Sequence, residues 1–379
     1  MRVTTDTTAN AESGYCPSCG AAVAPTARFC EACGAPLAPT EDAAEAVAAE
    51  LPIELTASVP SWQRAGGGAG SGGPAAPLPR PCLSCGGTVD ADGYCEICGT
   101  KAPSERDHYV EQPAAWVAAC CDRGIRHSRN EDAVAVSASA EPGRRAVLVV
   151  CDGVSTADDS DVASLAAARA ARDVLVGSRP AGLGVRESQV AALEAALVKA
   201  AEKANAAVLA TTAEDASNPA SCTYVAAVVE GDLCVVGNIG DSRAYWIPDP
   251  GAGDPIQLTV DDSVAQLRIA AGVPREVAEE GPQAHAILKW LGRDTPDFRP
   301  TTSSTQLTGP GWVLVCSDGL WNYASKATEL QALITQLSAT AGSDPLPLAE
   351  AMVRWACDQG GRDNISVALA RHAPVEATS

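Results

Sequence analysis

The sequence predicts an α+β layered sandwich that follows a short cysteine-rich N-terminal region. Three observations predict it: apolar runs of strand length recur from about residue 114 onward, long alanine-rich segments with helical spacing interrupt them, and two of the strand-like runs share a tight turn. Groups of strands broken by pairs of helices suit a layered sandwich better than a strictly alternating parallel fold. With 379 residues, 46% of them hydrophobic, the larger part of the chain can bury a full core.

The composition argues against several classes of function. The formal net charge is −20 and the sequence pI is about 4.5. Nucleic-acid binding rests on Lys and Arg side chains that displace counterions, so a strongly acidic chain predicts no nucleic-acid partner. The first residues do not resemble a signal peptide, and no apolar run approaches the ~20 residues of a membrane span. The sequence therefore predicts a cytoplasmic protein that has no membrane partner.

Eight of the 15 cysteines form a duplicated pattern near the N-terminus, in which each copy has two Cys-x-x-Cys-Gly pairs. Four thiolates on two tight turns suit a tetrahedral structural Zn²⁺ site. A segment this short cannot bury a hydrophobic core, so a bound metal ion would stabilise its fold. Disulfide bonds between the cysteines are the alternative. The pattern resembles zinc ribbons, which serve as protein docking modules. Two Zn²⁺ ions are predicted, in ribbon 1 (14–37) at Cys16, Cys19, Cys30 and Cys33, and in ribbon 2 (81–101) at Cys82, Cys85, Cys95 and Cys98.

The remaining segments divide into two linkers and one large domain. Residues 38–80, rich in Ala and Glu and then in Gly and Pro, read as a flexible linker, and residues 102–113 as a shorter one. The large domain is predicted over 114–372. Its predicted strands are 115–121, 145–151, 222–230, 232–239, 242–247, 312–317 and 364–370, and its predicted helices are 162–177, 187–210 and 346–358.

Acidic residues recur at the ends of the predicted strands. The segments 149–153, 315–319 and 361–364 each place an aspartate in a turn beside an apolar strand. A single Asp-Gly pair more often marks only a turn. Together with the acidic residues of 129–132 and 238–243, however, the three segments predict carboxylates that converge on one edge. Carboxylate oxygens are the hard ligands that Mg²⁺ and Mn²⁺ prefer.

These five segments, in this order, closely resemble the metal-dependent protein phosphatase family, the type 2C serine/threonine phosphatases, in their bacterial form. The resemblance covers roughly 114–372 and implies a four-layer α-β-β-α sandwich, with two antiparallel sheets flanked by helices and a two-metal centre at one end. It also implies that Asp152 bridges two Mn²⁺ or Mg²⁺ ions, and that Asp241 corresponds to a third, more weakly held ion. The remaining implied ligands are Glu131, the Gly153 carbonyl, Asp318 and Asp363.

The resemblance implies an enzyme that hydrolyses phosphoserine and phosphothreonine on proteins through a two-metal-activated hydroxide, with Asp152 and Asp318 as its catalytic carboxylates. The implied partners are phosphoprotein substrates, among them a serine/threonine kinase or its targets. No Cys-x5-Arg phosphate loop, as in phosphotyrosine phosphatases, occurs in the sequence.

One position departs from the family pattern. His127 stands where the family carries an arginine that grips the substrate phosphate. Three readings remain open: the neighbouring Arg126 or Arg129 binds the phosphate, His127 itself binds it or protonates the leaving oxygen, or His127 only packs at the rim. The departure also keeps a second hypothesis, a catalytically weak or silent phosphatase-like scaffold that binds phosphoproteins.

Overall fold

The computed structural model describes Gly14–Tyr15, Ala22–Val23 and residues 82, 85–90, 94–99, 102, 104–178, 184–281, 283–295 and 297–373. The chain divides into two compact units, Met1–Leu78 and Pro79–Ser379. In the first unit, strand β1 (Gly14–Tyr15) pairs antiparallel with β2 (Ala22–Val23). The predicted zinc ligands of ribbon 1 and the predicted linker 38–80 lie outside the described residues. Those ligands are Cys16, Cys19, Cys30 and Cys33.

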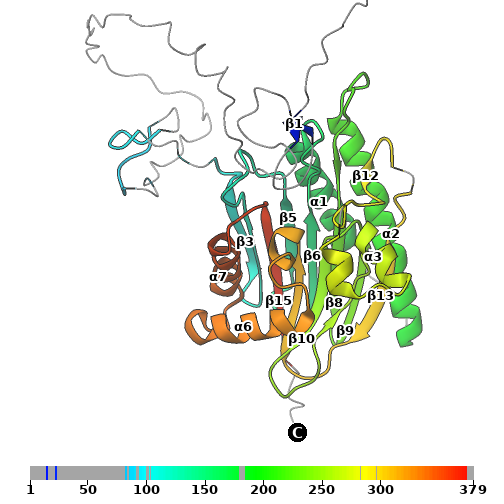
Figure 1. Ribbon diagram of the computed structural model, residues 1–379. Helices are drawn as coiled ribbons and strands as arrows, with labels where there is room; N and C mark the ends of the chain where they lie inside the picture. Colours follow the sequence, from blue (N-terminus) through cyan, green and yellow to red (C-terminus); the bar gives the residue numbers. More distant parts are fainter. Residues whose placement is uncertain are drawn as a thin grey trace, which may run out of the picture. The chain divides into compact units, whose positions relative to one another are not determined.

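The second unit contains two large antiparallel sheets (Figure 1). The six-stranded sheet has the order β11-β10-β14-β15-β4-β3, with strands β3 (His108–Ala114), β4 (Val117–Asp122), β10 (Arg243–Pro248), β11 (Ile256–Gln257), β14 (Gly311–Cys316) and β15 (Ile365–His372). The five-stranded sheet has the order β13-β9-β8-β6-β5, with strands β5 (Ala133–Ala138), β6 (Arg145–Cys151), β8 (Tyr224–Glu230), β9 (Leu233–Ile239) and β13 (Thr301–Gln306). A short pair joins β7 (Ser221–Cys222) to β12 (Leu291–Gly292).

Helices cover the outer face of each sheet, which confirms the predicted four-layer α-β-β-α sandwich (Figure 1). The five-stranded sheet carries α1 (Ser160–Gly177) and α2 (Arg186–Thr211). The six-stranded sheet carries α5 (Asp318–Trp321), α6 (Ala327–Ala341) and α7 (Pro345–Asp358). Two short helices, α3 (Val264–Ala270) and α4 (Arg275–Glu279), lie between β11 and β12 in the chain. Among the described residues, no helix has the length and apolar character that crossing a bilayer requires.

Three apolar cores hold the four layers together, one between each neighbouring pair of layers. Alternate residues of one strand serve two of these cores. In β6, Val147 and Val149 pack toward the helices, whereas Leu148 and Val150 pack toward the other sheet. A strand that is buried on both faces must therefore be a continuous apolar run. This is why β6, β8, β9 and β14 were predictable from the sequence.

The predicted start of the domain at residue 114 is too late. Strand β3 (His108–Ala114) occupies the second half of the segment predicted as a linker, 102–113, and pairs with β4 in the six-stranded sheet. Because β3 is an edge strand, its side chains alternate between exposed and partly buried positions and give no apolar run. Other elements absent from the sequence prediction include β5, β13 and α6.

Candidate active site

The predicted metal-binding carboxylates come from the ends of strands in both sheets. Asp152 follows β6 directly, Asp241 follows β9, and Asp318 begins α5 just after β14. Glu131 lies two residues before β5, and Asp363 lies two residues before β15. The start of β5 pairs with the end of β6, so segments that are distant in sequence meet at one end of the sandwich. The five residues thus occupy the edge that the sequence predicted.

Like charges crowd together at this end. Burial raises the pKa of Asp152 well above its usual range, and the carboxylates of Asp132, Asp318, Asp363 and Asp241 raise it further. Burial and the same kind of repulsion raise the pKa of Asp318, and burial raises the pKa of Asp241 to about 7. Such a cluster is unfavourable when fully ionised unless cations neutralise it.

Two buried carboxylate oxygens at this end have no hydrogen-bond partner among the described residues. They are Oδ1 of Asp318 and Oδ1 of Asp132. The other oxygen of each group is occupied, since Asp318 Oδ2 accepts from the Asn322 amide at 3.0 Å and Asp132 Oδ2 accepts from the Ser317 hydroxyl at 2.6 Å. A buried oxygen with free lone pairs is an expected cation ligand. The residues present therefore fit a divalent-cation centre.

The carboxylate of Glu131 is held by several donors. Its Oε1 accepts hydrogen bonds from Arg129 at 2.7 and 3.1 Å and from the Ser160 hydroxyl. Burial alone would raise its pKa, but hydrogen bonds from His127, Ser160 and Arg129 outweigh that effect and lower the pKa to about 2. Glu131 therefore stays ionised throughout the physiological range, and it is fixed in one orientation.

His127 lies between two of the predicted ligands. Its Nε2 is 3.4 Å from Asp363 Oδ1, and its Nδ1 is 3.8 Å from Glu131 Oε2. The two flanking arginines differ from it. Arg129 is paired with Glu131, whereas the exposed guanidinium of Arg126 makes no hydrogen bond or ion pair to any described residue. Of the three candidates for phosphate binding, the structure places His127 among the carboxylates.

Two glycines allow the ligand-bearing segments to approach closely. A Cβ at Gly153 would lie 2.6 Å from the carbonyl oxygen of Glu131, and one at Gly124 would lie 2.1 Å from the carbonyl oxygen of Asp363. Gly124 also has a φ of +72°, in the left-handed region that favours glycine. Neither site has room for a side chain, so these glycines set the spacing of the ligands.

Asn364 has a positioning role that sequence reasoning missed, although the residue was recognised as part of a motif. Its side-chain oxygen accepts from the Glu131 N–H at 2.8 Å, and its amide donates to the carbonyls of Arg123 at 2.7 Å and Arg129 at 3.1 Å. Asn364 therefore ties the segment that carries Glu131 to the segment that carries Asp363. A signal was present, because an amide residue directly precedes a strand that is buried along nearly its whole length.

A buried ion pair behind Asp241 was also missed. Arg243 makes hydrogen bonds of 2.6 to 3.0 Å to both carboxylate oxygens of Asp261, and its guanidinium lies 3.5 Å from the ring centroid of Trp321. The Trp321 indole N–H in turn donates to the Asp241 carbonyl at 3.0 Å. Asp261 is thus the counter-ion of a buried arginine.

Ribbon 2 brings its four predicted zinc ligands together. The sulfurs of Cys82, Cys85, Cys95 and Cys98 all lie within 4.8 Å of one another. The glycines that follow the second cysteine of each pair, Gly86 and Gly99, have φ values of +74° and +69°. All cysteines among the described residues are free of disulfides. The donor set and its compactness fit a tetrahedral structural Zn²⁺ site.

We expect the exchange Cys95→Ser to lower the zinc content of the purified chain by about one ion, because a four-sulfur site loses most of its affinity when one thiolate is removed. Elemental analysis by mass spectrometry, after dialysis against Mg²⁺, measures this. Cys357→Ser is the matched control, since Cys357 is also a free thiol but lies on α7, outside the cluster. Equal zinc contents in both variants would contradict the assignment.

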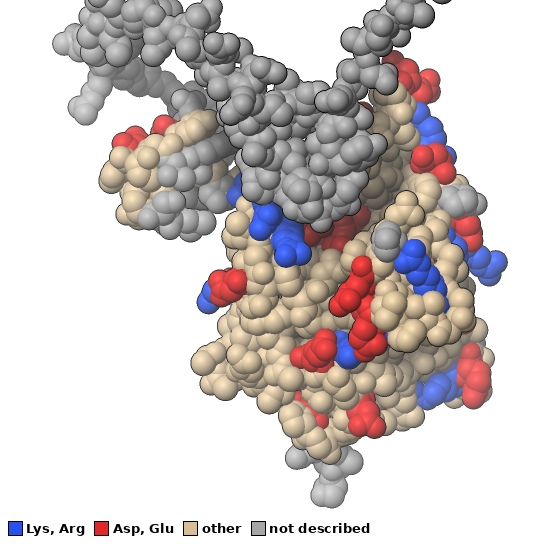
Figure 2. Space-filling view, in the orientation of Figure 1, with Lys and Arg blue, Asp and Glu red and all other residues tan. Residues whose placement is uncertain are grey.

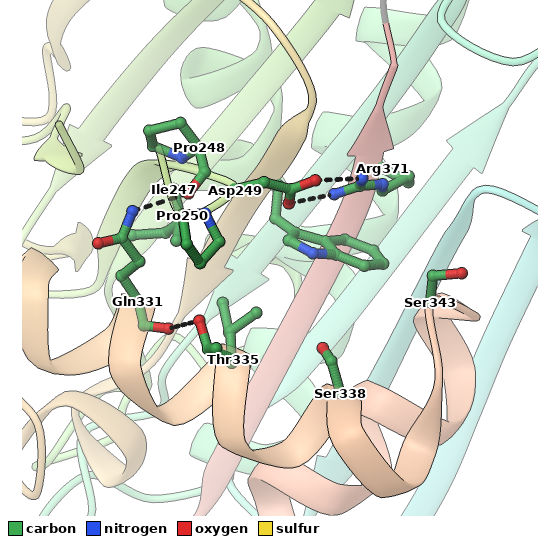
Figure 3. Close-up of a pocket in the computed structure, with 11 residues that line it drawn as sticks. Ile247, Pro248, Asp249, Pro250, Gln331, Thr335, Ser338, Ser343 and Arg371 are labelled. Carbon is green, nitrogen blue, oxygen red and sulfur yellow. Dashed lines mark hydrogen bonds and ion pairs between the residues drawn. The ribbon is translucent and has the colours of Figure 1, made fainter. Parts of the chain in front are cut away.

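The cavity shown in Figure 3 is not the candidate active site. It has a volume of about 240 Å³ and lies at the opposite ends of β10 and β14, beside α6. Arg371 forms two hydrogen bonds to Asp249, at 2.6 and 2.7 Å, and its guanidinium lies 5.0 Å from the Trp312 ring centroid. None of the predicted catalytic residues lines this cavity.

Comparison with known sequences decides the family. The sequence profile described as protein phosphatase 2C matches residues 123–355. The chain belongs to the protein phosphatase 2C family. A second profile, described as a double zinc ribbon, matches residues 16–99 of this phosphatase 2C chain, the region of the duplicated cysteine pairs.

Curated relatives of this phosphatase 2C chain include bacterial serine/threonine phosphatases. The serine/threonine protein phosphatase PstP of Mycobacterium tuberculosis is 31% identical over 254 residues, 67% of this chain and 44% of PstP. The chain thus spans less than half the length of that relative. The serine/threonine phosphatase stp of Listeria innocua is 29% identical over 251 residues, 65% of this chain and 92% of the relative.

Solved structures agree with this assignment. The crystal structure of PstP/Ppp from Mycobacterium tuberculosis is 25% identical, with a TM-score of 0.53 over 70% of this chain and 99% of that chain. The crystal structure of Stp1 from Staphylococcus aureus is also 25% identical, with a TM-score of 0.53 over 68% of this chain and 94% of that chain. Both support the fold prediction for the phosphatase 2C domain, and the individual metal ligands remain predictions.

Proposed function

We propose that this phosphatase 2C chain hydrolyses phosphoserine and phosphothreonine in proteins with the help of Mn²⁺ or Mg²⁺. The observation that carries the proposal is the crowded carboxylate cluster, in which two buried oxygens lack a hydrogen-bond donor among the described residues. When bound, a pair of divalent cations supplies an acidified water and neutralises charge on the phosphoryl group.

Within this proposal the chain's own residues have separate tasks. Asp152, Asp318 and Asp363 hold the cations, together with the Gly153 carbonyl, and Asp241 serves a third ion. Asn322 orients Asp318 through its amide. Glu131, which Arg129 and Ser160 hold in one orientation, faces the same centre.

His127 is proposed to bind the substrate phosphate in place of the family arginine, since it lies among the carboxylates while Arg129 is engaged by Glu131. We expect His127→Ala to raise KM for a phosphothreonine peptide about tenfold, the value of one charge-assisted hydrogen bond. His127→Arg is expected to keep KM near that of the wild type, because it restores a phosphate-binding guanidinium. Steady-state kinetics at saturating Mn²⁺ measure both.

Arg126→Ala is the control, because Arg126 is also basic and is separated from His127 by a single peptide bond. If Arg126→Ala raised KM more than His127→Ala did, the phosphate-binding role would pass to Arg126. An unchanged KM in every variant would return His127 to a packing role at the rim.

Phosphate release from a phosphothreonine peptide, with Mn²⁺ and then with excess chelator, tests the proposed function. Turnover that requires Mn²⁺ is the expected result. The substitution at His127 motivates the second candidate, a phosphatase-like scaffold. Tight peptide binding without turnover in the Mn²⁺-loaded protein would favour that scaffold.

The ribbons and the domain cysteines bear on the partners of the chain and on its cellular compartment. Each ribbon is proposed to hold one structural Zn²⁺ and to dock a protein partner, such as a phosphoprotein substrate, a serine/threonine kinase or one of its targets. On the face that Figure 2 shows, the described basic side chains lie in small groups among acidic ones, which suits a protein partner better than nucleic acid. The cysteines of the phosphatase domain, such as Cys151 and Cys316, form no disulfide, which fits a reducing, cytoplasmic compartment.

A further inference from the structure

A row of side chains from the segment 106–116 hydrogen-bonds the free edge of β5. We call this row the seam. Its bonds run from the Arg106 guanidinium to the Asp132 carbonyl, from the Val134 N–H to the Tyr109 hydroxyl at 2.8 Å, from the Val136 N–H to Glu111 Oε2 at 2.8 Å, and from the Trp116 indole N–H to the Ser139 carbonyl at 2.8 Å.

The seam pairs backbone groups at the edge of the five-stranded sheet. Strand β5 is the last strand of the five-stranded sheet, and β3 is the last strand of the six-stranded sheet. An edge strand leaves every second residue with unpaired backbone groups. The acceptors and donors used by the seam at 132, 134 and 136 follow that alternation. Side chains thus replace a backbone ladder and join the two sheets.

Arg106 is the member of the seam closest to the metal centre. Besides the Asp132 carbonyl, its Nη2 contacts the Asp161 carbonyl at 3.1 Å and the Ser164 hydroxyl at 3.3 Å. Its own carbonyl accepts from the Asn130 amide at 2.9 Å. Arg106 therefore contacts the residues on both sides of position 131.

The Ser164 hydroxyl, which Arg106 contacts, also donates to the carbonyl oxygen of Glu131. The backbone of Glu131 is thereby fixed at several points: Ser164 donates to its carbonyl, Asn364 accepts from its N–H, and Arg106 holds the carbonyl of the next residue, Asp132. An error of 1 Å in a ligand's backbone moves its carboxylate out of reach of a cation.

We propose that Arg106 is a positioning residue of the metal centre, which fixes segment 130–132 so that the Glu131 carboxylate keeps its place. The inference rests on the proposed function only in taking Mn²⁺ as the ion. Arg106 precedes the stretch 123–355 that matches the family profile, and it belongs to a segment that the sequence suggested as a linker.

Mn²⁺ binding tests the proposal directly. We expect Arg106→Met to weaken Mn²⁺ binding about tenfold, the usual effect of removing a partner that orients a metal ligand, and to leave kcat at saturating Mn²⁺ within about threefold of the wild type. Arg106→Lys, which keeps one charged donor, is expected to lie between the two. Calorimetric titration of the full, zinc-loaded chain gives the affinity without any need for turnover.

Two controls separate positioning from stability. Glu111→Ala removes the seam bond to the Val136 N–H, farther from Glu131, so it should lower the free energy of unfolding without changing Mn²⁺ affinity. Arg172→Met removes an arginine of α1 that bonds only its neighbour Asp173 and should change neither. Hydrogen exchange should quicken at amides 130–134 in Arg106→Met while β14 stays protected.

Unchanged Mn²⁺ affinity in both Arg106 variants would overturn the proposal. So would a loss of affinity in Glu111→Ala equal to that in Arg106→Lys, because the effect would then follow stability alone. A wild-type chain that binds Mn²⁺ but does not release phosphate would contradict the proposed function, while the binding measurements would still decide the role of Arg106.

Discussion

Replacing Asp152 by asparagine is expected to lower Mn²⁺-dependent turnover at least about 1000-fold, which corresponds to about 4 kcal/mol of lost transition-state stabilisation. Asp152 is the proposed bridge between two cations, and a neutral amide cannot hold both. The same exchange should raise the free energy of unfolding of the metal-free chain, because burial and then repulsion from the neighbouring carboxylates raise the pKa of Asp152, and both act far less on a neutral amide.

Asp152→Asn is thus expected to lower turnover and to raise the stability of the metal-free chain, a combination that damage to the fold would not produce. Turnover is measured by phosphate release, and stability by urea denaturation in chelator. Asp249→Asn is the control, since Asp249 pairs with Arg371 at the far end of the sandwich (Figure 3) and should leave turnover unchanged. Turnover within tenfold of the wild type in Asp152→Asn would refute the role of the bridge.

Gly124→Ala is expected to cost about 4 kcal/mol of the free energy of unfolding. Part of the cost, about 1 kcal/mol, comes from a non-glycine residue at positive φ. The larger part comes from the new Cβ, which would lie 2.1 Å from the Asp363 carbonyl oxygen. Because that oxygen must move, the variant should also bind Mn²⁺ more weakly.

Gly143→Ala isolates the clash. Gly143 has nearly the same φ, +74° against +72° for Gly124, but nothing lies within 4 Å of the Cβ that it would gain. It should therefore cost only about 1 kcal/mol. Urea denaturation of the two variants compares them, and equal losses would show that the close approach at Gly124 has no energetic role.

The sequence predicted the strands that are buried on both faces and missed those at the edges. Strand β9 is buried along its whole length, and its run of apolar residues reveals it. Strand β13, with the sequence Thr-Thr-Ser-Ser-Thr-Gln, is an edge strand whose polar side chains resemble a loop. The position of β13 is fixed by its pairing with β9, and the local sequence of β13 gives no sign of that pairing.

The candidate site likewise contains residues that the sequence predicts and residues that only the fold reveals. Carboxylates such as Asp152 and Asp318 sit in short motifs that carry their own signal, so the sequence was sufficient to propose them. Arg106 was not predictable, since its partner Asp132 lies 26 residues away and the bond exists only after two sheet edges meet. Asn364 and Glu131 are separated by 233 residues. Residues that orient the ligands are identified by their contacts with those ligands, and these contacts are known only once the fold is known.

The most direct test is a Mn²⁺ titration of the full, zinc-loaded chain in which bound Mn²⁺ and phosphate release from a phosphothreonine peptide are measured in the same samples. The expected result is no turnover in chelator, followed by a rate that rises as two Mn²⁺ ions per chain are bound. Full turnover in excess chelator, or a chain saturated with Mn²⁺ that releases no phosphate, would contradict the assignment of the carboxylate cluster as a metal-dependent phosphatase centre.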